Sequence, residues 1–197
     1  MQQPEFELLS SHILKRVQLT DEELAFMLSK FKLTKIKKRQ FIVQPGFTAK
    51  FRNYVCSGAF RAYVVIDNGE DHTIQFAIED WWITDYNSFF NDQPATMFVI
   101  ALEDSVILQL SRENEDLLKQ ANHKYETFFR ISAERAQAFH FRQLITNLTQ
   151  PAEFRYESFL DRYPQIVNRV PQYALASYLG MTTEYLSKLR NKRTAKQ

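Results

Sequence analysis

Residues 172–191 read QYALASYLGMTTEYLSKLRN. Apolar side chains recur in this stretch at the spacing of two short helices that share one core, namely Leu175, Leu179, Met181, Leu186 and Leu189. Gly180 lies between the two runs, where a tight turn requires a positive φ. The pattern predicts a helix-turn-helix, whose second helix would enter the major groove of DNA.

The predicted second helix offers short polar groups and cations on its outward face, which the major groove admits. We expect Glu184 to accept from a cytosine amino group and Lys188 to donate to a guanine edge. Thr182 or Thr183 can cap the helix, and both would contact phosphate or a thymine methyl group. An alternative for Glu184 is a favourable charge in the first helical turn. The predicted DNA-binding residues are Thr182, Thr183, Glu184, Tyr185, Ser187, Lys188, Arg190, Lys192 and Arg193.

Positive charge gathers beside this motif. The whole chain has 25 basic and 23 acidic residues and a net charge of +2, but residues 169–197 hold six basic residues, Lys196 among them, and one acid. Arg190, Lys192 and Arg193 would mainly neutralise phosphates, which adds affinity without sequence preference. A solvated tail would show the same charge run, but the adjacent helix-turn-helix spacing favours phosphate binding.

Two segments of different periodicity precede the long helical region. Residues 1–32 are expected to be helical, with a capping box at residues 20–23. From Gln40 to Leu110 the apolar period is two, and turn signals such as Ser57-Gly58 separate the runs. Short strands at this spacing predict an antiparallel sandwich or rolled barrel. Ser111 is expected to cap a short helix that follows.

A run without glycine or proline from Lys124 to Leu148 predicts one long helix. Heptad positions in it are occupied by Ile131, Ala138, Phe141, Ile145 and Leu148, with Glu134 as an interruption. This pattern indicates the seam of a homodimer, although the stripe could instead pack on the β domain. The segment 149–151 ends the helix. The expected domains are a sensor domain at 1–123, a dimerisation helix at 124–148 and a DNA-binding domain at 149–197.

Composition limits the class of protein. With 45% apolar and 24% charged residues, the 197-residue chain has an ordinary globular composition. It has no long uncharged apolar run and no signal-peptide pattern, which predicts a cytoplasmic protein without a membrane span. The single cysteine, Cys56, excludes an internal disulfide and a cysteine-ligated iron–sulfur cluster built from one chain.

Catalytic and cofactor chemistry finds little support. No nucleophile–base arrangement or phosphate-cradling glycine loop is present, so we expect no enzyme. A cupin-type metal needs a His-x-His pair, but His72 stands alone in the strand region, with His12, His123 and His140 elsewhere. A lone histidine is more often structural than a haem ligand, and Cys56 on an alternating strand is more often an inert core thiol than a redox switch. We therefore expect no metal and no cofactor.

The order of a jelly-roll-like β domain, a long helix and a C-terminal helix-turn-helix resembles the bacterial Crp/Fnr transcription regulators. Residues 41–46, 54–61 and 67–70 are similar to the β-roll signatures of that family, and residues 184–188 resemble its Glu-x-x-Ser-Arg motif with lysine in place of arginine. The resemblance implies an α+β fold, in which an antiparallel β-roll with flanking helices precedes a dimerisation helix and a helical DNA-binding domain. It implies double-stranded DNA, a second copy of the chain and RNA polymerase as partners, with a small-molecule effector or none.

The effector region departs from the family pattern for cyclic nucleotides. Members that bind them carry Phe-Gly-Glu and, several residues later, an arginine for the cyclic phosphate. Here Asp85 stands for the glutamate, and Ala95 or Thr96 stands where the arginine belongs. With Trp82, Asp85 and Thr96 form the candidate effector pocket.

Charge in this region argues against cyclic AMP or GMP in the usual mode. Between Arg61 and Arg112 lie 50 residues without lysine or arginine and with nine acids. A buried phosphate requires a charge-assisted partner, and the long helix, through Arg130 or Arg135, is the remaining source of one. The sequence thus predicts a sequence-specific DNA-binding regulator that does not respond to cyclic AMP in the usual way. The alternative is a small-molecule sensor or interaction module whose C-terminal helices dock a protein.

Overall fold

The computed structural model describes residues 4–194, and its internal contacts divide the chain into two compact units. Unit 1 comprises residues 1–62 and 76–136, and unit 2 comprises residues 63–75 and 137–197. Within residues 4–194, no helix has both the length and the apolar character that crossing a membrane requires.

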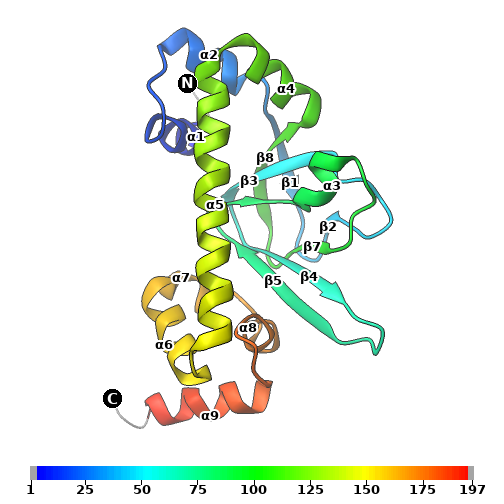
Figure 1. Ribbon diagram of the computed structural model, residues 1–197, viewed down its shortest axis with the longest axis vertical. Helices are drawn as coiled ribbons and strands as arrows, with labels where there is room; N and C mark the ends of the chain where they lie inside the picture. The colour runs from blue at the N-terminus through cyan, green and yellow to red at the C-terminus, as the bar shows by residue number, and fades with distance from the viewer. Residues whose placement is uncertain (1–3, 195–197) are drawn as a thin grey trace. The chain divides into compact units, whose positions relative to one another are not determined.

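Two four-stranded sheets make up the β-roll (Figure 1). The first has the order β1 (Lys32–Ile36), β8 (Ser105–Ser111), β3 (Phe51–Ser57), β6 (Trp82–Ile83). The second has the order β2 (Phe41–Val43), β7 (Phe98–Ala101), β4 (Phe60–Val65), β5 (Asp71–Ala77). The pairs β1–β8, β3–β8, β3–β6 and β2–β7 are antiparallel. The expected antiparallel roll with flanking helices is confirmed.

Strand β3 is buried on both faces, and its side chains alternate between two cores. Tyr54 belongs to a cluster that includes Leu9 of α1 (Pro4–Leu14) and Phe128 of α5 (His123–Thr149). Val55 belongs to a second cluster, which also contains Phe60 and draws on strands of both sheets. The second cluster is the interior of the roll, and the first is covered by helices.

Helices α2 and α4 begin at the caps that the sequence predicts. Helix α2 (Asp21–Leu28) has the predicted capping box: the Thr20 Oγ1 accepts from the Glu23 N–H at 3.2 Å, and the Glu23 Oε2 accepts from the Thr20 N–H at 2.8 Å. The Ser111 hydroxyl oxygen caps α4 (Arg112–Ala121), as expected. A further helix, α3 (Tyr86–Asn91), was not foreseen within the strand region.

The helical prediction for residues 1–32 was wrong at its end. Helix α2 ends at Leu28, and strand β1 begins at Lys32 and pairs with β8. Strand β1 lies at the edge of its sheet, where Lys32 and Lys35 are exposed. Charged side chains on an edge strand discourage pairing with other chains, and here they hide the apolar alternation that identifies a strand.

The turn between β3 and β4 depends on a glycine. Gly58 has φ +103°, a conformation that L side chains rarely adopt. A Cβ on Gly58 would stand 2.0 Å from the Ser105 Oγ and 2.8 Å from the Ser105 Cα. The predicted Ser57-Gly58 turn is therefore present, and the close approach of β8 adds a second reason for glycine.

Unit 2 is mainly helical. It contains the part of α5 from residue 137, α6 (Ala152–Arg162), α7 (Pro164–Val167), α8 (Gln172–Tyr178) and α9 (Thr183–Thr194). Helix α5 spans the predicted length and ends at Thr149, just before Pro151. The outer ends of β4 and β5 also belong to this unit: the Ser177 Oγ on α8 accepts from the Thr73 N–H at 2.8 Å and donates to the Asp71 carbonyl oxygen at 3.2 Å.

Candidate nucleic-acid interface

Helices α8 and α9 form the predicted helix-turn-helix. Leu175 and Ala176 of α8 and Leu186 of α9 are buried. Between the helices Gly180 has φ +65° and donates its N–H to the Ser177 carbonyl oxygen at 3.1 Å, while the Met181 N–H donates to the Ala176 carbonyl oxygen at 3.0 Å. These two bonds and the left-handed glycine are a Schellman motif, which ends α8 and redirects the chain.

An arginine that the sequence pattern did not single out ties this turn to the end of α5. Arg155 of α6 donates through Nη2 to the Gly180 carbonyl oxygen at 3.1 Å. Its Nη1 donates to the carbonyl oxygens of Asn147 and Gln150, both at 3.1 Å. Because all three acceptors are backbone carbonyls, which every residue has, no residue pattern could have identified the contact.

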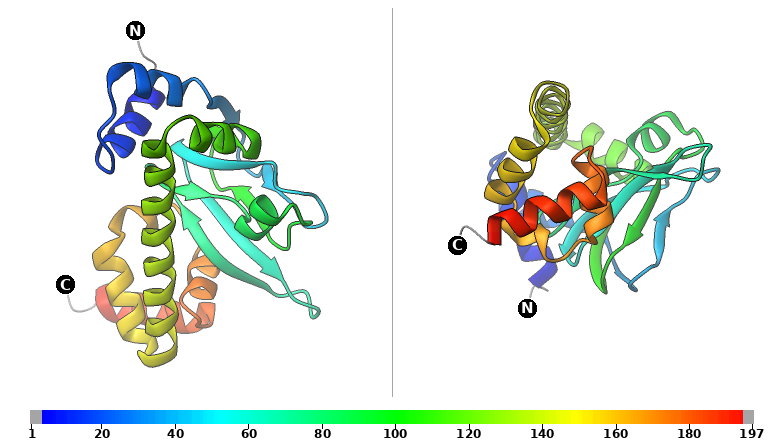
Figure 2. Two further views of the ribbon diagram at one scale, coloured as in Figure 1. Left: turned by 45° about the horizontal axis from the view of Figure 1, so that its top comes forward. Right: turned by 90° about the horizontal axis from the view of Figure 1, so that it is seen from below.

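Most of the predicted DNA-binding residues lie on the exposed face of α9. In the right-hand view of Figure 2, α9 lies in front of the other described elements of unit 2. Ser187 and Arg190 are half-buried because they flank the buried Leu186 and Leu189. The exposed members of the set are Thr182, Thr183, Glu184, Tyr185, Lys188, Lys192 and Arg193.

The start of α9 uses two of these residues locally. The Thr182 Oγ1 accepts from the Tyr185 N–H at 3.2 Å, so Thr182 is the residue that caps the helix. Hydrogen bonds from the Glu184 backbone N–H and the Thr182 side chain lower the pKa of the exposed Glu184 carboxyl, as does the nearby charge of Lys188. Glu184 thus also fills the role of an acidic group in the first turn, the alternative considered for it.

The cations at the end of α9 differ in their surroundings. The Lys192 Nζ lies 3.5 Å from Glu153 Oε1 of α6, and both side chains are largely exposed. Arg190 has interactions within the chain, whereas Lys188 and Arg193 are exposed. Lys196, which contributed to the predicted basic segment, lies outside the described residues.

The heptad stripe on α5 is exposed over its second half. Four large apolar side chains remain accessible there, with exposed fractions between 52% and 76%: Phe141, Leu144, Ile145 and Leu148. Ala138 is exposed as well, and Ile131 is half-buried. Within unit 2, these heptad positions are therefore not buried by the described elements.

Of the candidate effector residues, Asp85 and Thr96 are hydrogen-bonded to each other. Asp85 is fully buried, and its Oδ2 accepts from the Thr96 N–H at 2.8 Å, while its Oδ1 accepts from the Ser88 N–H at 3.0 Å and caps α3. Trp82 packs in the helix-covered cluster instead, with its ring centroid 5.1 Å from that of Tyr54. The Asp85 carboxylate thus holds the α3–β7 connection together.

A buried cation that the sequence reading overlooked lies on β3. The Arg52 Nη1 lies 2.9 Å from the Glu115 Oε2 of α4, and its guanidinium stands 4.8 Å from the Trp82 ring centroid. The same contacts place it among the helix-covered residues. Arg61 of β4 is also buried and interacts within the chain. Arg61 directly precedes the segment 62–111, which has no lysine or arginine of its own, and Arg52 contacts Trp82 within that segment.

His12 and Cys56 are both buried within unit 1. Because an indole N–H can only donate, the Trp82 Nε1–H at 3.2 Å requires His12 Nε2 to accept, and His12 Nδ1–H then donates to Asp80 Oδ1 at 2.6 Å. Both ring nitrogens of His12 are therefore occupied. Burial raises the pKa of the Cys56 thiol to about 12, which keeps it protonated. Within residues 4–194, no cluster of three or more histidine, cysteine or acidic residues could hold a metal ion.

Comparison with known proteins agrees with this architecture. Residues 33–121 match the family model described as the cyclic nucleotide-binding domain. A search of curated proteins finds no match. Among solved structures, the chain is similar to FixK2 from Bradyrhizobium japonicum (14% identity, 84% of this chain and 85% of that chain, TM-score 0.71).

Two further structures share the fold. One is the catabolite activator protein of Thermus thermophilus (17% identity, 94% of this chain and 87% of that chain, TM-score 0.58). The other is from Eubacterium rectale and is described as a Crp/Fnr-family transcriptional regulator (13% identity, 90% of this chain and 85% of that chain, TM-score 0.68). At these identities the likeness shows a common fold.

Proposed function

We propose that this chain, which has the fold of the Crp/Fnr regulators and a segment matching the cyclic nucleotide-binding domain, is a sequence-specific DNA-binding transcription regulator that acts as a homodimer. The observation that carries the proposal is the exposed polar face of α9 on a closed helix-turn-helix core. A helix presented in this way is the element that enters the major groove in proteins of this architecture.

Base recognition is assigned to Lys188 and Glu184, which lie one helical turn apart on the exposed face of α9. Lys188 donates to a guanine edge, and Glu184 accepts from a cytosine amino group. The position of Glu184 in the first turn supports both roles, because a carboxylate has two oxygens and several lone pairs. Thr183 and Tyr185 are exposed beside Glu184 and would face the same major groove of the DNA.

Phosphate contacts are assigned to Arg190, Lys192 and Arg193 near the end of α9. These side chains add affinity through release of counterions, without choosing a sequence. Lys192 and Glu153 form a long, exposed ion pair, and such pairs contribute little. Exchanging Glu153 for a phosphate therefore costs little.

Dimerisation is assigned to the exposed apolar stripe of α5. Phe141, Ile145 and Leu148 occupy heptad positions and are more than half exposed in the single chain. A second copy of the helix would cover them in a coiled coil. A two-fold pair of α9 helices can then read two half-sites about one turn of DNA apart.

The effector, if the protein uses one, is not a cyclic nucleotide bound in the usual mode. The Asp85 carboxylate is occupied by backbone donors within the fold, and Arg52 is paired with Glu115. Arg130 of α5 is exposed and lies 2.7 Å from Glu134. Arg61, the other buried arginine of the β-roll, also interacts within the chain. These contacts support the expectation that a cyclic nucleotide does not bind in the usual mode.

Selection of genomic DNA fragments by the full-length chain tests the function. We expect retention of a small set of fragments that share an inverted repeat, with binding that weakens as salt is raised. If no fragment is enriched above bulk DNA at any salt concentration, the DNA-binding proposal is wrong, and a protein-docking role for the C-terminal helices becomes the better one.

A further inference from the structure

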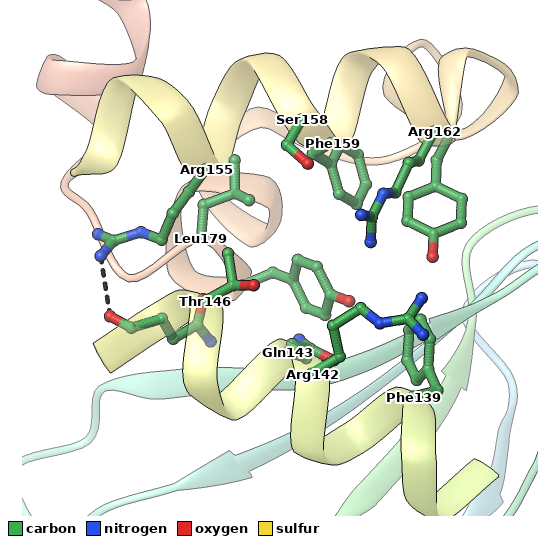
Figure 3. Close-up of a pocket in the computed structure, with 12 residues that line it drawn as sticks. Phe139, Arg142, Gln143, Thr146, Arg155, Ser158, Phe159, Arg162 and Leu179 are labelled. Carbon is green, nitrogen blue, oxygen red and sulfur yellow. Dashed lines mark hydrogen bonds between the residues drawn. The ribbon is translucent and has the colours of Figure 1, made fainter. Parts of the chain in front are cut away.

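A cavity of about 60 Å³ lies wholly within unit 2, between α5 and α6 and beside the end of α8 (Figure 3). A water molecule needs about 10–15 Å³ on the same measure, so the cavity has room for roughly four to six non-hydrogen atoms. It is partly open to solvent. The space therefore suits a small flat group with a substituent that reaches solvent.

The charge of the cavity lining has one sign. Three arginines line it, Arg142 from α5 and Arg155 and Arg162 from α6, and no acidic residue is among the described residues around it. Both terminal nitrogens of the Arg155 guanidinium donate to backbone carbonyl oxygens. Arg142 and Arg162 are exposed, and in Figure 3 their guanidinium groups lie at the same end of the cavity.

Tyr163 lines the cavity together with Arg142 and Arg162. Burial raises the pKa of Tyr163, and the charges of Arg162 and Arg142 both oppose that rise. Two guanidinium groups that lie at the same end of one cavity, as in Figure 3, repel each other unless an anion lies between them. Their placement thus favours an anionic group at the mouth of the cavity.

The remaining lining is mostly apolar and aromatic. Phe159 is buried, with its ring centroid 5.6 Å from that of Tyr178. Leu179 completes the buried side of the cavity. Rings at this spacing offer faces and edges on which a flat ring can pack.

The proposed dimer would not supply a carboxylate to this site. With Ala138 and Ile145 at one core position of the heptad and Phe141 at the other, Arg142 falls at an e position. In a parallel coiled coil an e residue faces a g residue of the second helix, and the corresponding position is Gln137. A glutamine cannot neutralise the guanidinium.

We propose that this cavity is a ligand site for a small aromatic anion, whose ring packs between α5 and α6 and whose phosphate or carboxylate is bound by Arg142 and Arg162. The site lies outside the β-roll. A ligand there joins the end of α5 to α6 across residues 149–151, the link that also leads to the helix-turn-helix. If the chain is the regulator proposed above, on which this step rests, such a ligand changes its affinity for DNA.

Titration of the full-length protein with phenyl phosphate, followed by ligand-observed NMR, tests the site itself. From the usual affinity per atom of a small ligand, we expect saturable binding with a dissociation constant of about 1 mM. Benzoate shows whether a carboxylate serves as well, and inorganic phosphate shows how much the ring adds. Benzyl alcohol, which lacks the charge, should not saturate.

Three variants locate the binding. Arg142→Gln and Arg162→Gln each remove one charged donor and should weaken phenyl phosphate binding about tenfold or more. Lys35→Gln removes the same charge from an exposed position on β1 and should bind like the wild type. Ser158→Leu fills the space for the ring, and it should weaken phenyl phosphate far more than inorganic phosphate.

Several outcomes would overturn the site. The first is an absence of saturation by any of the anions. The second is equal binding by Lys35→Gln, Arg142→Gln and Arg162→Gln. The third is equal binding of benzyl alcohol and phenyl phosphate. Circular dichroism melts of each variant verify that the fold is retained. An effect of Ser158→Leu alone shows that the ring space matters even if an arginine variant is unstable.

The effect of the ligand on DNA binding is measured separately. Phenyl phosphate at saturation should change the affinity of the selected DNA fragment about fivefold or more, and not in the Arg142→Gln variant. If the ligand binds but leaves DNA affinity unchanged, the coupling is wrong and the site stands. If the chain binds no DNA, the proposed function fails, and the NMR titration still decides the site.

Discussion

Replacing Ile145 by alanine should weaken the dimer about a hundredfold. The substitution removes about three methyl or methylene groups, each worth about 0.8 kcal/mol when buried. In the single chain 57% of Ile145 is exposed, so covering that part contributes about 1.4 kcal/mol per copy on the same scale. A symmetric dimer contains the contact twice, which gives about 3 kcal/mol, or about a hundredfold in the dissociation constant.

Sedimentation equilibrium over a wide range of protein concentration measures this change directly. Ile74→Ala is the matched control, because it makes the same change at a side chain that is 42% exposed on β5 and is not part of the α5 heptad pattern. The control should dimerise like the wild type, and the two variants should have similar free energies of unfolding as monomers. A wild-type chain that stays monomeric, or two variants that dissociate alike, would refute the assignment of the seam.

Three other predictions concern recognition, packing and pH. Lys188→Ala should relax sequence preference by about 1–3 kcal/mol at one base pair, whereas Lys192→Ala should weaken binding to all sequences alike and flatten its salt dependence. Binding assays on matched and mismatched fragments at several salt concentrations distinguish the two variants. Equal effects of both would contradict the assigned roles. Gly58→Ala should lower the free energy of unfolding, measured in urea, by about 3 kcal/mol or more, because the new Cβ collides with Ser105 and the backbone has φ +103°. A change below about 1 kcal/mol would show that β8 can shift. Burial lowers the pKa of His12 below 6.5 in the folded state, so the unfolded chain binds the proton more readily. The free energy of unfolding should therefore fall as the pH drops below about 6.5, by at most about 1.4 kcal/mol per pH unit. A His12→Gln variant with the same pH dependence as the wild type would show that His12 is not the cause.

Local features of the chain were predictable because they depend on residues close together in sequence. The Schellman turn at Gly180, the capping box of α2 and the length of α5 each involve a few neighbouring residues. Hydrogen-bond geometry within one or two helical turns settles them, and residue type is then a sufficient guide. Strand β1 was missed because the lysines of an edge strand weaken the apolar alternation.

Contacts between residues far apart in sequence could not be predicted from the sequence pattern. Arg155 joins carbonyl groups of the α5 end, of the following link and of Gly180, and Arg52 finds Glu115 across 63 positions of sequence. The cavity between α5 and α6 depends on how two helices pack. Such partners follow from the path of the backbone, since carbonyl groups and apolar walls carry no distinctive residue signature.

The sequence alone determined the order of elements, the helix-turn-helix and the lack of lysine and arginine between Arg61 and Arg112. Each of these depends on residue type and spacing along the chain. The tertiary structure decided which surfaces remain available. It left the α5 stripe and the α9 face exposed, enclosed Asp85, and placed Arg142 and Arg162 at one cavity. Exposure depends on what every other part of the chain covers, and that is settled only when the whole chain packs.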